Sequence, residues 1–186
     1  MKHDTALLLI DFQIGFSDPV WGMRNNPDAE AKAASLLTAW RATGAPIAHI
    51  RHLSLQHGSP LAGAGSAWMP ALAPIGNEQR FEKSVNSAFI GTGLEAWLRE
   101  QQLGTLVVAG LTTPHCVSTT CRMAANLGFG VTLAHDACAA FSSNADQAWL
   151  TPPAPHMSAE DSHRAAISHL HGEFVSALPV ADILQQ

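Results

Sequence analysis

The sequence predicts an α/β fold in which a mainly parallel sheet is covered by helices on both faces. Short apolar runs alternate along the chain with stretches of helical periodicity. Several of these runs lack the alternation of a half-exposed strand, as expected when both faces of a parallel strand are buried. The chain has 186 residues, of which 47% are hydrophobic, so we expect one domain over residues 1–186 with a full core.

Six apolar runs are predicted to be strands. They cover residues 6–10, 46–50, 79–83, 105–109, 130–134 and 172–175. Four helices are predicted from apolar residues that recur at helical spacing. They cover residues 29–43, 92–101, 116–127 and 158–171. Because these strands and helices alternate, the strands are expected to be parallel.

Helix ends are marked by residues that favour caps. Asp28 precedes the first helix and Gly44 follows it. The second helix places Leu94, Trp97 and Leu98 on one face, and a glycine lies just past its end.

The two later helices carry similar signals. Gly128 ends the third predicted helix. Ser158 is expected to cap the fourth, with Asp161 three residues later in a loose capping box.

Composition excludes several classes of partner. Ten Lys and Arg residues against fifteen Asp and Glu give a formal charge of −5, so no nucleic-acid partner is expected. No apolar stretch approaches a membrane span, and the first apolar run is too short for a secretory signal. The three cysteines, an odd number without paired spacing, argue for a reducing compartment and against disulfides or a zinc cage. A cytoplasmic protein is therefore expected.

Three reactive side chains are predicted to meet at the carboxyl ends of the strands, where such sheets bind ligands. Asp11 follows the first strand, Lys83 ends the third, and Cys116 lies after the fourth. Cys116 also starts a predicted helix, whose dipole is expected to lower the pKa of the thiol and favour the nucleophilic thiolate. A carboxylate at the end of an apolar strand needs a cation partner, so we expect Lys83 near Asp11.

Four segments of the chain resemble a known family, the isochorismatase-like cysteine hydrolases. They are residues 7–13 (LLLIDFQ), 82–89 (EKSVNSAF), 110–120 (GLTTPHCVSTT) and 135–137 (HDA). The resemblance spans nearly the whole chain and implies a three-layer α/β/α sandwich with a six-stranded, mainly parallel sheet. It also implies a homodimer or homotetramer. By that resemblance Asp11, Lys83 and Cys116 form a catalytic triad.

The resemblance further implies a cis peptide at Leu111–Thr112 and an oxyanion hole made by the backbone N–H groups of Thr112 and Cys116. Family members that cleave a vinyl ether lack the nucleophilic cysteine, so Cys116 indicates C–N bond hydrolysis of a small amide. No metal or other cofactor is expected for this chemistry.

A substrate pocket is predicted near the triad. Its expected lining is Gln13, Phe16, Trp21, His52 and His115. Three further aromatic residues, either wall or core, are Phe12, Trp68 and Trp149.

Two alternatives remain open at this point. One is a metal-dependent nicotinamidase, in which His49, His52 and His57 would supply ligands. The other is a non-catalytic redox or partner-binding module with Cys116 as a sensor thiol. Cys121 lies five residues further along the predicted helix, about 140° around its axis, which disfavours a direct disulfide between the two.

Overall fold

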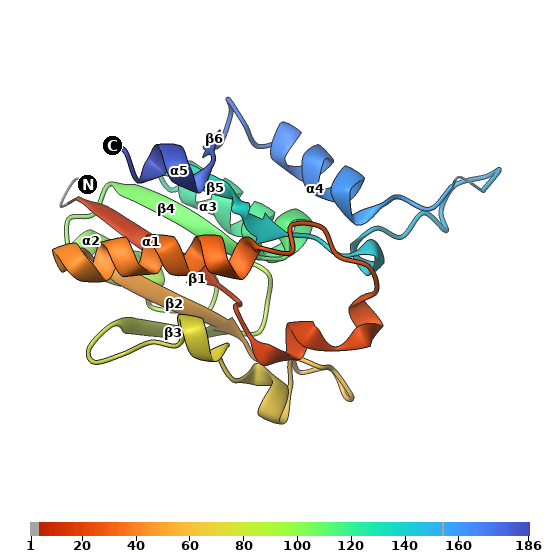
Figure 1. Cartoon of the computed structure of the whole chain (residues 1–186), viewed down its shortest axis with the longest axis horizontal. Coiled ribbons are helices and arrows are strands. Elements are labelled where there is room, and N and C mark those ends of the chain that lie inside the picture. The colour runs from red at the N-terminus through yellow and green to blue at the C-terminus, as the bar shows by residue number, and fades with distance from the viewer. Residues whose placement is uncertain (1–3, 154) are drawn as a thin grey trace.

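Six parallel strands form the central sheet of the computed structural model, which describes residues 4–153 and 155–186 (Figure 1). The order across the sheet is β3-β2-β1-β4-β5-β6. The strands are β1 Thr5–Ile10, β2 Ile47–His52, β3 Gln79–Lys83, β4 Thr105–Leu111, β5 Gly130–Ala139 and β6 Ser176–Leu178. The predicted α/β class with a parallel sheet is confirmed.

Helices cover both faces of the sheet and give three layers (Figure 1). The α-helices are α1 Ala29–Thr43, α2 Leu94–Glu100, α3 Ser118–Asn126, α4 Ala159–Ser168 and α5 Val180–Ile183. Helices α1 and α5 pack on one face, and α2 and α3 pack on the other. Short helical turns join them: η1 Ile14–Ser17, η2 Pro19–Trp21, η3 Gly63–Ser66, η4 Pro70–Leu72, η5 Thr113–Val117 and η6 Ser142–Asn144. No helix in the described ranges is long and apolar enough to cross a membrane.

The central strand β1 contributes to a hydrophobic cluster on each face of the sheet. Leu7 and Leu9 belong to the cluster with Trp40 of α1, whereas Leu8 and Ile10 belong to the opposite cluster. All four β1 side chains are buried. This two-sided burial explains why the run is apolar throughout and shows no alternation.

Two predicted elements agree closely with the structure. The helix over residues 29–43 and the strand over residues 79–83 have the predicted bounds. Gly44 ends α1 in the left-handed conformation (φ +65°), as a C-terminal glycine does. Asp28 precedes α1, but its side chain makes no capping hydrogen bond.

Other bounds differ from the prediction, most clearly at the sixth strand. Residues 172–175 form a turn in which the Gly172 N–H donates to the Val175 carbonyl, and the strand is β6 instead. Gly172 has φ +88°, a conformation that glycine adopts readily. Helix α4 is shorter than predicted, but Ser158 caps it by accepting from the Asp161 N–H.

The strand order reverses between β1 and β4, so the topological switch point lies between these two strands. The chain segments that leave β1 and β4 therefore diverge around a crevice at the carboxyl edge of the sheet. Gly110 allows the two strands to lie close together there, because a Cβ at this position would be 2.4 Å from the Ile10 carbonyl oxygen.

Candidate active site

Asp11, Lys83 and Cys116 come together at this crevice. Asp11 follows β1, Lys83 is the last residue of β3, and Cys116 lies in η5 directly after β4. Lys83 Nζ donates to Asp11 Oδ2 at 2.7 Å and lies 3.3 Å from Cys116 Sγ. The side chains of Asp11 and Lys83 are both fully buried. The long lysine side chain thus passes the end of β2 to reach residues that follow the two central strands β1 and β4.

Asp11 presents one carboxylate oxygen that has no hydrogen-bond partner within the described ranges. Oδ2 accepts from Lys83, whereas the buried Oδ1 has no partner. Asp11 has φ +56°, a conformation that aspartate tolerates better than most residues, and its N–H donates to the Ile50 carbonyl. The free oxygen is available as a proton acceptor beside the thiol.

Burial governs the protonation of the two acidic groups. It raises the pKa of the Asp11 carboxyl, and the Lys83 ammonium opposes this effect. Burial, together with the Asp11 charge, raises the pKa of the Cys116 thiol to about 12, again against the effect of Lys83. The predicted lowering of the pKa of Cys116 is therefore wrong. Cys116 is only 9% exposed and lies inside the π-helical turn η5 rather than at the start of an α-helix.

A cavity of about 170 Å³ opens onto Cys116. Its lining residues come from the end of β2 and from the segments that follow β1, β2, β3, β4 and β5: Phe16, Trp21, His52, Ser54, Gln56, Ser59, Leu61, Asn86, Thr112, His115, Cys116 and Asn144. Phe16, Trp21, His52 and His115 were predicted to line the pocket and do line this cavity. That the cavity binds substrate stays a prediction.

Gln13 does not line the cavity, and its predicted place there is corrected. Its buried amide accepts from the His52 N–H at 2.7 Å and donates to the carbonyls of His52 and Ser66. A buried amide needs hydrogen-bond partners, and Gln13 finds them on the nearby backbone. These bonds join the end of β1 to the end of β2.

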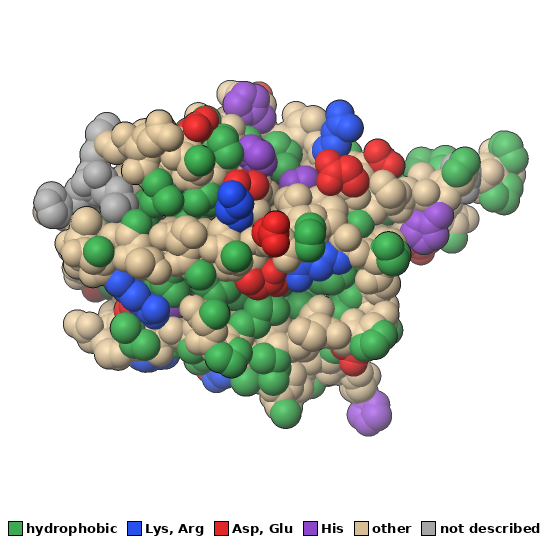
Figure 2. Space-filling view, viewed as in Figure 1, with side chains coloured by type: hydrophobic (Ala, Val, Ile, Leu, Met, Phe, Trp, Pro, Cys, Tyr) green, Lys and Arg blue, Asp and Glu red, His purple; other side chains and the backbone are tan. Residues whose placement is uncertain are grey.

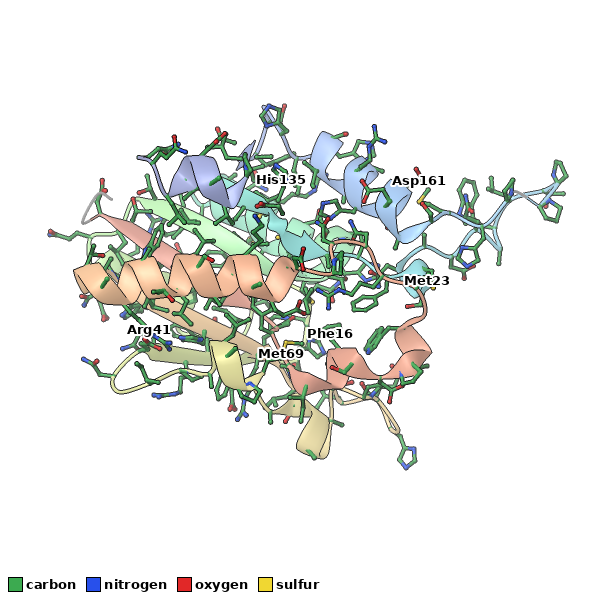
Figure 3. All side chains as sticks on the ribbon, viewed as in Figure 1. Phe16, Met23, Arg41, Met69, His135 and Asp161 are labelled. Carbon is green, nitrogen blue, oxygen red and sulfur yellow. The ribbon has the colours of Figure 1, made fainter. Side chains whose placement is uncertain are left out.

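Aromatic side chains form one wall of the cavity. The Phe16 ring lies 5.0 Å from the Trp21 ring and stacks on Phe141 at 5.8 Å, measured between ring centroids. Trp21 Nε1 donates to the Gly15 carbonyl, so its polar atom is already satisfied. Phe16, labelled in Figure 3, reaches the site from η1.

The other aromatic candidates lie elsewhere. Phe12 is a core residue, and Trp68 packs under the Arg51 guanidinium. Trp149 is 78% exposed in a segment that extends away from the sheet (Figure 1) and carries hydrophobic side chains at its end (Figure 2).

The three histidines proposed as metal ligands do not converge. His49 and His52 are three residues apart on β2, so their side chains lie on opposite faces of the sheet. His49 Nε2 pairs with Glu78 Oε2 at 2.8 Å, and His57 is exposed. This alternative ligand set does not fit the structure, because strand geometry separates His49 from His52.

A different group, Asp11, His52 and Cys116, places its potential ligand atoms within 4.8 Å of one another. The ammonium of Lys83 lies among them, 2.7 Å from Asp11 Oδ2 and 3.3 Å from both His52 Nδ1 and Cys116 Sγ. A divalent cation bound there would face this ammonium at close range, which is strongly repulsive. The site does not fit a metal, and no metal enters the mechanism below.

Two contacts of the turn that carries Cys116 were missed from the sequence. The Cys116 thiol lies 3.8 Å from Asn86 Oδ1. Asn86 belongs to the same segment, residues 82–89, as Lys83, the residue of this segment that the sequence pointed to. Thr113, the first residue of η5, is hydrogen-bonded to the buried His163 of α4 at 2.8 Å. The sequence of α4 gave no sign that its histidine, His163, contacts the turn that carries Cys116.

The backbone around η5 has the expected cis peptide at Leu111–Thr112. Thr112 and Cys116 both line the cavity, and their use as an oxyanion hole stays a prediction. Cys121 and Cys138 are free and fully buried. A sensor thiol is normally accessible and acidic, which Cys116 is not, so the redox module is disfavoured.

Comparisons with known proteins agree on one family. The family described as Isochorismatase domain matches residues 5–178. The isochorismatase family protein YrdC of Bacillus subtilis is 38% identical, over 99% of this chain and 96% of the relative. A crystal structure of an isochorismatase family member from Chromobacterium violaceum shares 44% identity and a TM-score of 0.91, over 99% of this chain and 93% of that chain. Streptothricin hydrolase of Streptomyces noursei is 32% identical, over 91% of this chain and 58% of the relative.

Proposed function

Because the chain belongs to the isochorismatase family of hydrolases, we propose that it hydrolyses the C–N bond of small amides through Cys116 as the nucleophile. The observation that carries this proposal is the arrangement at the floor of the cavity. A thiol faces the cavity, a lysine ammonium lies 3.3 Å from its sulfur, and the carboxylate paired with that ammonium keeps one oxygen free. These are a nucleophile, an electrostatic stabiliser and a base.

The first half of the reaction forms a thioester. Asp11 takes the proton of the Cys116 thiol as the sulfur attacks the amide carbon, and the carbonyl electron pair moves to oxygen. The N–H groups of Thr112 and Cys116 are assigned to this oxyanion. When the intermediate collapses, the C–N bond breaks and Asp11 returns the proton to the departing nitrogen.

The second half releases the acid. Water attacks the thioester carbon while Asp11 accepts one of its protons. The C–S bond then breaks, and the thiolate takes that proton back from Asp11. The products of the whole reaction are the carboxylic acid and ammonia or an amine. The enzyme returns to its starting protonation state.

Lys83 controls when charge appears on sulfur. Because the pKa of Cys116 is raised to about 12, the resting side chain is a thiol and loses its proton only as the C–S bond forms. The ammonium stabilises the sulfur anion and the Asp11 carboxylate at once, from 3.3 and 2.7 Å. The reaction therefore does not require that a fraction of the enzyme carry Cys116 as a thiolate before substrate binds.

The comparisons support the proposal that the protein is a hydrolase, but they do not identify the bond that it cleaves. The relative named streptothricin hydrolase is a hydrolase by its name and aligns over 91% of this chain. The amide specificity rests on the cysteine and on the chemistry of the cluster around it.

The proposal is tested by ammonia release from a panel of small amides. The wild-type protein is expected to release ammonia, and Cys116→Ala is expected to release none. Cys121→Ala is the matched control, because Cys121 is a free buried cysteine that does not line the cavity. Rapid quenching and intact-mass measurement should show the acyl group on Cys116. An active Cys116→Ala variant would contradict the proposal, as would absence of ammonia from every amide.

A further inference from the structure

The cavity above Cys116 has an uncharged lining. None of the described residues that line it is a lysine, arginine, aspartate or glutamate. The charges below its floor belong to Asp11 and Lys83, which pair with each other at 2.7 Å and have no exposed side-chain surface. A charged group on a bound molecule would therefore meet no unpaired countercharge.

The two histidines of the lining do not supply a charge either. Burial lowers the pKa of His115, and burial together with the Lys83 ammonium lowers the pKa of His52. Both side chains are therefore neutral at neutral pH.

The size and apolar wall of the cavity limit what fits. An apolar cavity of about 150 Å³ accommodates a benzene molecule, so about 170 Å³ admits one ring or a short chain with a carboxamide. Phe16, Trp21 and Leu61 provide the apolar surface. The remaining lining is mostly neutral polar groups, such as Asn86 and Asn144, which suit an amide head rather than an ion.

We propose that the substrate is an uncharged carboxamide whose acyl part is a single ring or short chain, and that the neutral lining selects against carboxylate- and ammonium-bearing amides. This inference rests on the proposed function and names the substrate class of the same site. Its physical basis is the cost of burying an ion without a partner, which a neutral group of the same shape does not incur.

Two pairs of amides with matched shapes separate charge from size. Succinamate carries a carboxylate where 3-nitropropanamide carries an uncharged nitro group. β-Alaninamide carries an ammonium where butanamide carries a methyl group. Benzamide serves as the single-ring probe. Ammonia release by the full chain at pH 7.5 gives kcat/KM for each.

In each pair the neutral member is expected to have a kcat/KM at least about 100-fold higher. Equal values within a pair, or a preference for the charged member, would overturn the inference and leave the proposed function standing. If no amide of the panel releases ammonia, the proposed function fails, and the inference fails with it.

A variant tests whether the lining itself causes the preference. Gln56 lines the cavity from its exposed side, so Gln56→Arg adds a cation there. Its ratio of kcat/KM for succinamate over 3-nitropropanamide should rise at least about tenfold, because the carboxylate gains a partner. Gln56→Met, similar in length but uncharged, should leave the ratio unchanged. A ratio that is the same in both variants would contradict the assignment of selectivity to the neutral lining.

Discussion

The ammonium of Lys83 lies 2.7 Å from Asp11 Oδ2, and neither side chain is exposed to solvent. Lys83 ends β3 and Asp11 directly follows β1, with β2 between these two strands. A buried ion pair of this kind is costly to break, since removal of one partner leaves the other charge uncompensated. The pair also sets the charge environment of Cys116, because Lys83 contacts both the carboxylate and the sulfur.

Replacement of Lys83 by methionine should shift the pH dependence of activity. The ammonium lowers the pKa of both Asp11 and Cys116, so its removal raises both. Asp11 must be ionised to act as the proposed base, and the acidic limb of kcat/KM should therefore move to higher pH. We also expect kcat/KM to fall about 100-fold or more through lost charge stabilisation. Lys32→Met, at a side chain that is 47% exposed, is the control. An acidic limb that stays at the wild-type position would mean that Lys83 does not act on Asp11.

The same pair predicts non-additive stability. Asp11→Asn or Lys83→Met alone should lower the free energy of unfolding by about 3–5 kcal/mol, because each leaves a buried charge. The double variant leaves none and should be more stable than either single variant. Urea unfolding of all four proteins at pH 7 measures this coupling. If the two losses simply add, the residues do not form a buried pair in solution.

The raised pKa of Cys116 predicts how the thiol reacts without substrate. Iodoacetamide reacts with the thiolate, so labelling of Cys116 should be slow at pH 7 and rise up to pH 10 without a plateau. Cys121 and Cys138 are fully buried and should be labelled later still. Asp11→Asn should speed the labelling of Cys116, because the Asp11 charge helps to raise the pKa of that thiol. Peptide mass spectrometry over time gives each rate, and a plateau near pH 7 would show an acidic thiol instead.

Glu78 is predicted to stabilise the fold away from the active site. Its carboxylate accepts from Arg41 Nε at 2.7 Å and from the Ile75 N–H, and it pairs with His49. These partners outweigh burial and lower the pKa of Glu78 to about 2. A lowered carboxyl pKa stabilises the folded state above the unfolded value, and this stability is lost as pH falls from about 4.5 toward 2.

Glu78→Gln should therefore cost about 2 kcal/mol at pH 7 and clearly less at pH 3. Urea midpoints at the two pH values provide the measurement. Glu95→Gln, at an exposed ion pair with Arg99, should have little effect at either pH. A loss that is equal at pH 7 and pH 3 would assign the effect of Glu78 to packing rather than charge.

Sequence reasoning succeeded where local pattern and strand geometry suffice. The apolar run of β1 is buried on both faces, so its composition alone indicated a central parallel strand. The positions of Asp11, Lys83 and Cys116 at strand ends brought them to one edge of the sheet, as parallel topology requires.

It failed where a property depends on distant residues. A position at a helix start predicts a lowered pKa for the Cys116 thiol, but burial raises this pKa instead. That burial depends on the segments that cover η5, which are distant in the sequence. Gln13 next to Asp11 suggested a pocket residue, but its partners are 39 and 53 residues away. The strand predicted at 172–175 had suitable composition, whereas pairing with β5 selected the next three residues.

The hydrogen bond between His163 and Thr113 leads to a last prediction, about the positioning of Cys116, the proposed nucleophile. Asn26 Nδ2 donates to the Cys138 carbonyl and lies 3.3 Å from His163 Nε2. His163 Nδ1 lies 2.8 Å from Thr113 Oγ1, so the ring is hydrogen-bonded to the first residue of η5 through this nitrogen. Burial also lowers the pKa of His163 to about 4, which keeps the ring neutral. His163 therefore fixes the first residue of the turn that carries Cys116.

His163→Ala should lower kcat by about tenfold to 100-fold with little change in KM, because the turn would misplace the sulfur while Phe16, Trp21 and Leu61, on other segments, still form the apolar wall. His163→Asn places an amide near the position of Nδ1 and should restore part of kcat. His163→Gln places its amide near Nε2 and should not. Thr113→Val should lower kcat similarly, and its combination with His163→Ala should cost little more than either change alone. Equal rates for the Asn and Gln variants would contradict this prediction, because an effect of His163 on folding alone would not depend on which ring nitrogen is replaced. Fully additive losses in the double variant would contradict it as well. Either result would mean that His163 only stabilises α4.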